Sequence, residues 1–397
     1  MPADRVAIVG VGESRVGRLR GMSALRLTLE AAKAALQDAH LTPSAIDGVL
    51  TRNLDMDVTY MHSQLVAKHL GIQPRFTTDL NLGGATAVAM LEQARLLIAS
   101  GTCRFVLCAY GENRRTSWAN TRYGRIRMGN EDFEECFGLT WGMGPHALAA
   151  QRHMYEFGTT SRQLGLIAVT QRCYAQLHPN ADMRSPLSLE EYERAPYIIA
   201  PLRKYDLAYL FDGGAAVIVA PFAWARDHVA NPVVVLGLGQ AHSGHHIAYC
   251  ADMVISVTTP ARQSGAQAFR AAGIGPRDLD LALLYDDTTY GVLVQIEDYG
   301  FCHKGEGGHF VEAGHLGLLG SLPVNTHGGN LSQAHLDGML HVVEAVRQLR
   351  REAGPRQVSR ASVALVSGLG GVFATSTSAI LGTAAIEREV RSQGATD

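Results

Sequence analysis

The sequence predicts an α/β fold built from two related halves, and three observations lead to that prediction. At 397 residues, the chain is long enough to form two hydrophobic cores. Hydrophobic residues make up 47% of it and charged residues 18%, as in a well-buried globular enzyme. In addition, one arrangement occurs twice: a pair of glycines opens a helix, and an apolar strand follows it.

The repeat places a helix and a strand at corresponding positions of the two halves. The first predicted helix covers 83–100 and its strand 105–109; the second helix covers 328–351 and its strand 363–367. This alternation predicts mostly parallel central strands covered by helices. We expect the two helices to lie side by side, buried between the halves. We also expect strand 105–109 at a sheet edge, paired with its twin in a second copy of the chain.

The chain opens with a short apolar run over 6–12, Val-Ala-Ile-Val-Gly-Val-Gly, which predicts a buried strand. Its glycines suggest a dinucleotide-binding motif, but the third glycine of that motif would fall on Arg15, and no acidic partner follows the next strand. We therefore exclude that motif. Leucines at helical spacing then predict a helix over 22–40.

A polar segment over 221–232, bounded by two prolines, predicts the seam between the halves. The N-terminal half then covers 1–225, with a loop insertion at about 112–200, and the C-terminal half covers 226–397. The start of the insertion is too long and irregular for a simple connector. Its arginines either bind the phosphates of a nucleotide-bearing substrate or face solvent or a dimer partner; they are Arg114, Arg115, Arg122, Arg125 and Arg127.

Charge and cysteine usage exclude several classes of protein. A net charge of −2 provides no basic field for nucleic acid or an anionic membrane. The six cysteines have no CxxC spacing, so we expect no zinc ribbon within this chain. The sequence shows no signal peptide and no apolar run of about twenty residues. These observations predict a reduced, cytoplasmic protein.

Several motifs together resemble the thiolase superfamily, in the branch that includes sterol-carrier-protein-type thiolases. The resemblance covers nearly the whole chain. It implies a thiolase-like five-layer αβαβα sandwich of two pseudo-symmetric halves, usually dimeric. The motifs are the opening apolar run, Arg152-His-Met-Tyr-Glu-Phe-Gly-Thr-Thr, Pro201-Leu-Arg, Asp212-Gly-Gly-Ala-Ala, Asn325-Thr-His-Gly-Gly and the closing Gly368-Leu-Gly-Gly.

The chain departs from thiolases at both catalytic thiols. Gly84 stands where the family places its nucleophilic cysteine, and the second thiol is missing around 369–371. The chain thus looks most similar to the nucleophile-less thiolase-like aldolases that shorten steroid side chains, although His335 stands where that branch would have a tyrosine. This resemblance implies a carbon–carbon lyase of lipid metabolism. It would cleave a bulky β-hydroxyacyl-CoA to a ketone or aldehyde plus acetyl-CoA or propionyl-CoA. A small zinc-ribbon/OB-fold (DUF35-type) partner would join a homodimer to form a heterotetramer, with no cofactor beyond the coenzyme A thioester.

Retro-aldol cleavage needs a base for the β-hydroxyl and a stabiliser for the thioester enolate, but no covalent nucleophile. Tyr285 is the leading base, provided that its neighbours lower its pKa from about 10; otherwise it is a strand-end tyrosine bonded to backbone. His335 is the candidate enolate stabiliser or acid, and His327 a weaker one. Asp286 and Asp287 either orient these groups or cap a helix at Thr288.

Backbone N–H groups complete the predicted site. Helix N-termini after the two glycine pairs would point toward one cavity. The N–H groups of Gly84, Gly370 and Gly371 would bind the enolate oxygen as an oxyanion hole.

Three other readings stay open at this point. An acyltransferase would need another thiol, with Cys103 and Cys302 as candidates, and a non-catalytic acyl-CoA-binding subunit would need neither thiol nor base. A metal-dependent aldolase would need a cluster, but the candidate histidines and glutamates lie in a glycine-rich stretch that favours a loop, so we expect no metal site. They are His303, Glu306, His309, Glu312 and His315.

Overall fold

The computed structural model describes residues 5–54, 57, 59–117, 135–139, 143–243 and 257–387. Its strands form two half-sheets that join along a single short contact. In spatial order, the first half-sheet consists of β3 (Phe76–Leu80), β2 (Gly48–Arg52), β4 (Val106–Asn113), β7 (Asp212–Pro221) and β1 (Val6–Glu13). The second consists of β8 (Val233–His242), β11 (Thr375–Thr383), β10 (Val363–Gly370) and β9 (Leu281–Leu283).

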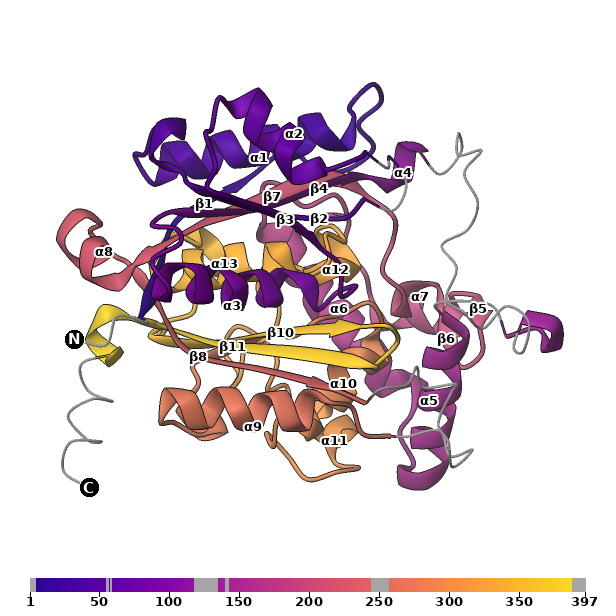
Figure 1. Ribbon diagram of the computed structural model, residues 1–397. Helices are drawn as coiled ribbons and strands as arrows, with labels where there is room; N and C mark the ends of the chain where they lie inside the picture. The colour runs from indigo at the N-terminus through magenta and orange to yellow at the C-terminus, as the bar shows by residue number, and fades with distance from the viewer. Residues whose placement is uncertain are drawn as a thin grey trace.

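The two half-sheets and their helices stack in five layers, in the order helix, sheet, helix, sheet, helix (Figure 1). The outer helices of the first half are α1 (Ala24–Asp38) and α2 (His62–Leu70). The central layer contains α3 (Thr86–Ala99) and α13 (Met339–Leu349), which contact each other. The outer layer of the second half contains α9 (Ala261–Ala272), α10 (Thr289–Asp298) and α11 (Gly307–Glu312). The predicted αβαβα sandwich is confirmed.

The remaining described elements lie at the ends of these layers. The short helix α8 (Phe222–His228) connects β7 to β8, at the predicted seam; the domain boundary itself stays a prediction. The insertion supplies α4 (Arg114–Ser117), α5 (Met143–Phe157), α6 (Ser161–Leu177), α7 (Leu189–Arg194) and β5 (Tyr197–Ile199), and β5 pairs with β6 (Leu202–Arg203) just after it. Within the described ranges, every helix is too short or too polar to span a lipid bilayer.

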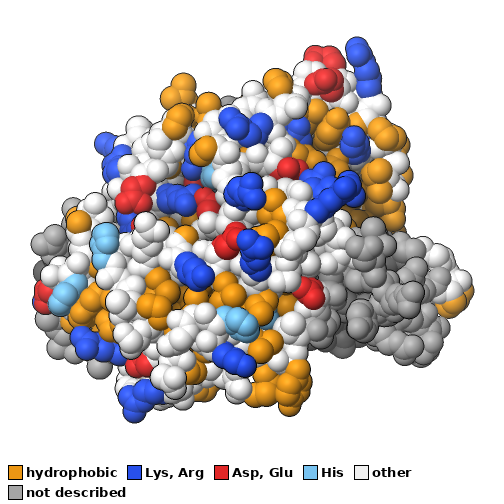
Figure 2. Space-filling model, turned by 90° about the horizontal axis from the view of Figure 1, so that it is seen from above, with side chains coloured by type: hydrophobic (Ala, Val, Ile, Leu, Met, Phe, Trp, Pro, Cys, Tyr) orange, Lys and Arg blue, Asp and Glu red, His pale blue; other side chains and the backbone are white. Residues whose placement is uncertain are grey.

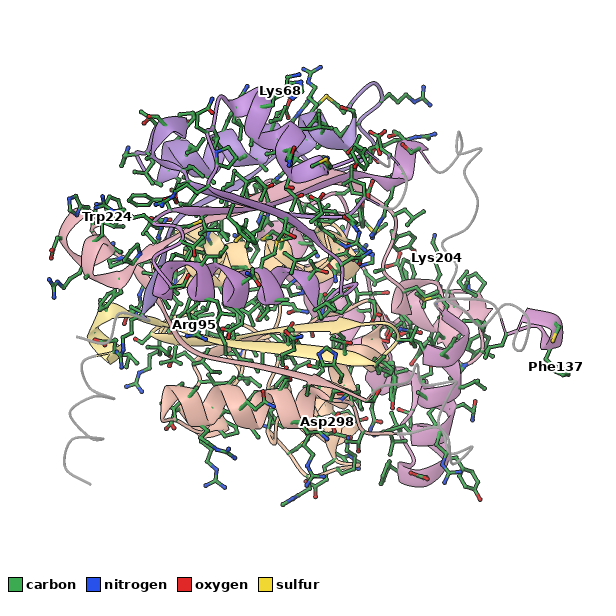
Figure 3. The ribbon with its side chains drawn as sticks, viewed as in Figure 1. Lys68, Arg95, Phe137, Lys204, Trp224 and Asp298 are labelled. Atoms are coloured by element: carbon green, nitrogen blue, oxygen red, sulfur yellow. The ribbon has the colours of Figure 1, made fainter. Side chains whose placement is uncertain are left out.

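Apolar side chains fill the space on both sides of each half-sheet (Figure 3). The outer face that carries α1 and α2 shows basic, acidic and apolar side chains intermingled (Figure 2). No single-sign field covers that face, as expected from the nearly balanced charge.

Two predictions about the sheet are wrong. The strands are mixed rather than mostly parallel, because β7 and β11 run antiparallel to their neighbours. A tight turn joins β10 to β11, and such a turn permits only antiparallel pairing. Strand β4, which contains 105–109 apart from its first residue, lies between β2 and β7 and is fully buried, so it cannot pair with a twin. Its apolar sequence reflects burial on both faces, and the sheet edges are β3 and β9.

The second repeated helix is broken, although the sequence predicted one helix over 328–351. A four-residue helix, α12 (Gly329–Ser332), ends before α13 begins at Met339. Asp337 and Gly338 have φ angles of 45° and 83° in the break, a conformation that a regular helix does not allow. As predicted, α3 and α13 lie side by side with largely buried surfaces. The break creates a loop between α12 and α13 inside the central layer.

Candidate active site

Tyr285 and His335 are the two predicted site residues that the fold brings into direct contact. Tyr285 follows the end of β9, and His335 lies in the loop between α12 and α13. The hydroxyl Oη of Tyr285 lies 2.8 Å from Nε2 of His335. The tyrosine is 3% exposed, whereas the histidine side chain keeps 16% of its surface. The pair thus connects a buried phenol to a partly accessible ring.

The backbone of Tyr285 is held on both sides, which fixes the direction of its ring. Its N–H donates to Oγ of Ser367 at 2.9 Å, and its carbonyl accepts from Nε2 of Gln295 at 2.7 Å. Both partners are fully buried. The alternative reading of a strand-end tyrosine whose hydroxyl bonds to backbone is wrong, because that hydroxyl faces His335.

The ring of Tyr285 fills the space that a side chain at position 84 would need. A Cβ atom on Gly84 would lie 2.0 Å from Cζ of Tyr285 and 2.4 Å from the carbonyl oxygen of Leu369. Real Cβ atoms do not approach other atoms so closely. The Tyr285 ring therefore occupies the space that a cysteine side chain at position 84 would need.

The glycine segments of the two halves meet at this point. A Cβ on Gly370 would lie 1.9 Å from the carbonyl oxygen of Leu82, and one on Gly368 would lie 2.7 Å from Cα of Ala85. Gly371 comes next and has a φ of 59°, which favours glycine. Gly84 thus lies against Tyr285, and Gly370 and Gly371 lie against the backbone segment that contains Gly84; the role of the three glycines in binding an oxyanion stays a prediction.

A buried charge network lies behind the pair. Asp337 accepts from Arg114 at 2.9 Å and pairs with Nε of Arg52 at 3.0 Å. Burial alone would raise the pKa of Asp337, but Arg114 and Arg52 outweigh it and hold that pKa well below the usual range. Oδ1 of Asp337 lies 3.5 Å from both Nε2 of His335 and the hydroxyl of Tyr285.

This network corrects the prediction for Arg114. Its guanidinium is buried and paired with Asp337, so it is not exposed to bind substrate phosphate. Arg115 pairs with Asp182 at 2.8 Å and stays partly exposed. The other three arginines of that stretch, Arg122, Arg125 and Arg127, lie outside the described residues.

The protonation states of the pair contradict the condition set for Tyr285 as a base. Burial, followed by the charges of Asp337 and Asp287, raises the pKa of Tyr285 well above 10, against the opposite effect of Arg114 and Arg52. Burial also lowers the pKa of His335 below 6.5. Near neutral pH the phenol keeps its proton and the imidazole is uncharged. Tyr285 is thus built to donate a proton, not to accept one.

Asp286 has a structural position that the sequence did not reveal. Its carboxylate accepts from the N–H groups of Asn330 at 2.9 Å and Leu331 at 3.2 Å, and from Nε2 of His341 at 2.9 Å. It therefore caps α12 rather than a helix at Thr288, where the Thr288 hydroxyl itself accepts from the N–H of Gly291. Asp286 thus accepts three hydrogen bonds from its protein neighbours, two from backbone N–H groups and one from His341.

His327 does not join the Tyr285–His335 pair. It is fully buried against His341, with ring centroids 4.6 Å apart. Burial, followed by the charges of His341 and His178, lowers the pKa of His327 well below 6.5. No hydrogen-bond partner for either ring nitrogen is found among the described residues.

The thiols and the histidine-rich segment lie apart from the pair. Burial raises the pKa of Cys103 to about 11 and that of Cys302 to about 12, which keeps both thiols protonated and weakly nucleophilic. His309 contacts Glu312, and His315 contacts Ser321. Among the described residues, no three His, Cys, Asp or Glu side chains converge to hold a metal ion.

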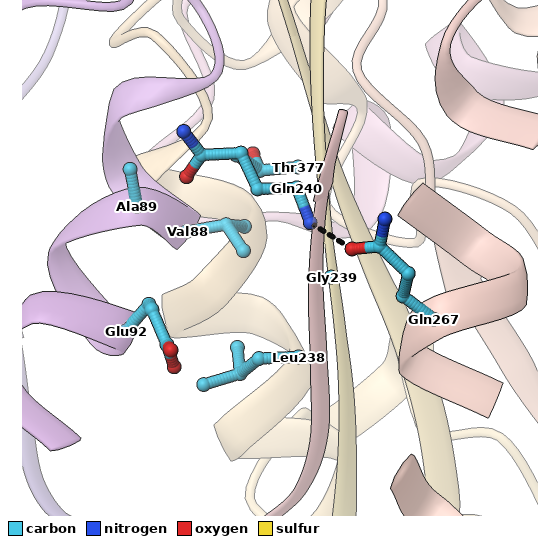
Figure 4. A pocket seen from close by; sticks show the side chains of 8 residues that line it. All are labelled: Val88, Ala89, Glu92, Leu238, Gly239, Gln240, Gln267 and Thr377. Carbon is cyan, nitrogen blue, oxygen red and sulfur yellow. Dashed lines mark hydrogen bonds between the residues drawn. The ribbon is translucent and has the colours of Figure 1, made fainter. Parts of the chain in front are cut away.

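A surface hollow between α3 and β8 has a volume of about 170 Å³ but lies apart from these groups (Figure 4). Gln240 donates its N–H to Gln267 across one side, at 3.0 Å. None of the predicted site residues lines it, and its only titratable side chain is Glu92, which pairs with Arg95. The hollow therefore does not compete with the Tyr285 region as a reaction site.

Several residues at the site carried no signal in the sequence. Arg52, His146 and His341 each reach it from an element distant in sequence, so that only the folded chain brings them there. Asp337 was detectable in principle, since it lies two residues after His335.

Comparison with known proteins gives consistent matches over nearly the whole chain. The family model "Thiolase C-terminal domain-like" matches residues 239–383. A steroid side-chain-cleaving aldolase of Thermomonospora curvata is 33% identical, covering 87% of this chain and 90% of that protein. The 17-hydroxy-3-oxo-4-pregnene-20-carboxyl-CoA lyase of Mycobacterium tuberculosis is 32% identical, covering 88% and 92%. An acetyl-CoA acetyltransferase of Methanothermobacter thermautotrophicus is 30% identical, covering 93% and 97%.

A solved structure gives the same result for the fold. The Ltp2-ChsH2(DUF35) aldolase matches with a TM-score of 0.87 and 32% sequence identity. The match covers 96% of this chain and 98% of that chain.

Proposed function

The chain belongs to the thiolase superfamily, in its branch of thiolase-like aldolases, and on that premise we propose that it shortens the side chain of a bulky β-hydroxyacyl-CoA. The enzyme is a carbon–carbon lyase that cleaves the Cα–Cβ bond. The single observation that carries this function is the packing of Tyr285 against Gly84: the ring stands where an acyl-transferring thiol would need to be.

Retro-aldol chemistry suits a site without a thiol. The β-hydroxyl loses its proton, the oxygen forms a carbonyl, and the electron pair of the Cα–Cβ bond moves into the thioester as an enolate. Protonation of the α-carbon then completes the acyl-CoA product. No bond to the enzyme forms in this sequence, so a nucleophilic cysteine is unnecessary.

The described residues fit the enolate half of this reaction. Tyr285 holds a proton beside His335, and together they supply it to the enolate. The N–H groups of Gly84, Gly370 and Gly371 bind the enolate oxygen, a contribution worth about 3 kcal/mol per donor in related oxyanion sites. Asp286 and His327 support the site from behind without touching the substrate.

The relatives suggest the substrate class and the assembly. We propose a steroid-like acyl group that is released as a ketone or aldehyde, with acetyl-CoA or propionyl-CoA as the second product. By analogy with the Ltp2-ChsH2(DUF35) aldolase, a homodimer of this chain would bind a small DUF35-type protein and work in the cytoplasm. The thioester is the only coenzyme required, so a chelator that leaves the partner intact should not reduce cleavage.

A product assay tests the proposal. The protein, with and without a DUF35-type partner, is incubated with β-hydroxyacyl-CoA thioesters that carry steroid or smaller side chains, and the products are identified by mass spectrometry. We expect a ketone or aldehyde in equal amounts with acetyl-CoA or propionyl-CoA. Intact thioester in every reaction that contains the partner would overturn the proposal.

Acyl transfer through another thiol is the rival activity, and the match to an acetyltransferase keeps it worth a direct test. Cys103 and Cys302 are protonated, and neither hydrogen-bonds to the described site. Treatment with iodoacetamide should leave the lyase active. Loss of activity that a substrate analogue prevents would instead favour a thiol-dependent enzyme.

A further inference from the structure

A second carboxylate, Asp287, lies two residues beyond Tyr285 and has an unused oxygen. Its Oδ2 lies 3.0 Å from Nε2 of His146, which comes from α5. Its Oδ1 is buried and has no hydrogen-bond partner among the described residues. The side chain as a whole keeps 16% of its surface exposed, through atoms other than Oδ1.

The protons of this group can be traced through its neighbours. Gly291 donates its N–H to Oγ1 of Thr288 at 2.9 Å, which leaves the hydroxyl proton free to be donated. Nδ1 of His146 lies 3.4 Å from that hydroxyl and can accept its proton in the tautomer that carries hydrogen on Nε2. The ring then carries its own proton on Nε2, facing Asp287. This chain of bonds fixes the tautomer of His146 and keeps Asp287 as an oriented carboxylate.

The same helix contains a similar arrangement that is complete. His153 contacts Thr159 at 2.8 Å through Nδ1 and Glu297 at 3.0 Å through Nε2. The other oxygen of Glu297 accepts from the N–H of Gly307 at 2.9 Å. Buried polar atoms in folded proteins are almost always paired, so the unpaired Oδ1 of Asp287 calls for an external donor, whereas Glu297 needs none.

The position of Asp287 suits the reacting end of the substrate. Phe373, in the turn that follows Gly371, packs edge-on against His146 with ring centroids 4.5 Å apart. The glycine segment beside Tyr285 and the His146–Asp287 pair are thus joined by one short turn. Asp287 also belongs to the same loop as Tyr285, and its charge is one cause of the raised pKa of that phenol.

We propose that the carboxylate of Asp287 is the base that accepts the β-hydroxyl proton, and that His146 is a positioning residue behind it. This inference rests on the proposed lyase function. The proton moves from the substrate oxygen to Asp287, the oxygen–hydrogen electron pair becomes the new carbonyl, and the Cα–Cβ pair enters the enolate. The Tyr285–His335 pair then protonates the α-carbon. Exchange with water restores both groups, so protons and electrons balance without any co-reactant.

The test separates removal of the hydroxyl proton from handling of the enolate. Wild type, Asp287→Asn, Asp287→Glu and Tyr285→Phe are assayed for cleavage and for exchange of the α-hydrogens of acetyl-CoA or propionyl-CoA in D₂O. Asp287→Asn should lower kcat for cleavage at least about 100-fold, the usual contribution of a positioned base, and keep α-exchange within about threefold. Asp287→Glu should recover part of the cleavage. Tyr285→Phe should lose both reactions.

The two histidines of α5 supply a matched pair of controls. His146→Gln should lower kcat about tenfold with KM little changed, because the carboxylate remains but is no longer oriented. His153→Gln, which removes the buried contact between His153 and Glu297, should lower the melting temperature and leave kcat within about threefold.

Two results would overturn the assignment. One is an Asp287→Asn variant that cleaves within threefold of wild type; the other is a folded variant that loses α-exchange as much as cleavage. Failure of the proposed function itself looks different, because wild-type protein would then fail to cleave any thioester, and the assignment would fall with it.

Discussion

The hydroxyl of Tyr285 lies 2.8 Å from Nε2 of His335, and the surroundings drive each group toward its uncharged form. Because the pKa of the phenol is raised and that of the imidazole is lowered, the proton between the two groups stays on the phenol, which holds it beside the uncharged ring of His335. Such a pair is better suited to protonating an enolate than to removing a hydroxyl proton.

Replacing Tyr285 with phenylalanine should abolish cleavage with little effect on folding. The ring that fills the space in front of Gly84 is kept, and only the hydroxyl bonded to His335 is lost. We expect kcat to fall by roughly 100-fold or more, with thioester affinity nearly unchanged. Steady-state kinetics and thioester titration check this, and wild-type rates in the variant would remove Tyr285 from the mechanism.

His335→Ala should reduce turnover but not to the level of an inactive protein. The variant loses one partner of the phenol, a loss comparable to one oxyanion-hole donor, or about 3 kcal/mol of transition-state stabilisation. The ring is partly exposed, so its removal should leave the melting temperature close to that of wild type. A kcat/KM equal to that of wild type would show that Tyr285 acts without its neighbour.

Gly84→Cys should not create a thiolase. The new side chain would collide with the Tyr285 ring and with the carbonyl of Leu369, and the second thiol would still be missing. We expect loss of cleavage, no acyl transfer, and destabilisation of about 1–3 kcal/mol from overpacking. Gly317→Ala serves as the control, because a Cβ there meets only one atom at an ordinary 3.6 Å. Acyl transfer by the cysteine variant would contradict the packing argument.

Stability should fall as the pH falls below about 6.5. Burial lowers the pKa of His178 to about 3, and burial also lowers the pKa of His327 and His335. Between the folded and unfolded pKa values, the unfolded chain binds more protons, so acid favours unfolding in that window and has no such effect above it. His178 alone would cost about 2 kcal/mol at pH 5.

Urea unfolding at pH 7.5, 6 and 5 measures this loss. His178→Gln should flatten the dependence, since the lowered pKa disappears with the ring. An equal free energy of unfolding at all three pH values in wild type would show that these histidines stay accessible to protons in the folded state.

Asp337→Asn should destabilise the protein strongly. It would remove the buried carboxylate that pairs with both Arg52 and Arg114, and breaking a buried ion pair typically costs about 3–5 kcal/mol. Asp227→Asn provides the comparison, because its ion pair with Arg226 is on the surface and should contribute little. Chemical denaturation measures the free energy of unfolding of both variants. A small loss of this free energy in Asp337→Asn would mean that water reaches the arginines.

The sequence predicted the layers well because their signals are local. Apolar runs marked the strands, and the glycine pairs marked where central helices begin. The neighbours of a strand are not local, so β4 was placed at an edge although it lies inside the sheet. The helix break before Met339 contained Asp337-Gly338, a pair compatible with positive φ, but the strong apolar periodicity after it concealed the signal.

The site was predictable in its residues but not in its electrostatics. Resemblance to a family selected Tyr285, His335 and Gly84, and the fold brings them together. The direction of a pKa shift depends on burial and on charges from distant segments, such as Arg52 at the end of β2. Likewise, nothing in the letters Asp286-Asp287 distinguishes a helix cap from a carboxylate with an unused oxygen.

The contact between Tyr285 and Gly84 limits which substitutions could convert this chain to an acyltransferase. A cysteine introduced at position 84 would collide with the Tyr285 ring. A mutation that removed the ring would leave neither a lyase nor a thiol. Conversion to thiolase-type acyl transfer would thus need at least three changes, namely a cysteine at position 84, a smaller residue at position 285 and a second thiol, with inactive proteins between them. Positions 84 and 285 are therefore coupled by packing, and a substitution at either one alone should give an inactive protein rather than a different enzyme.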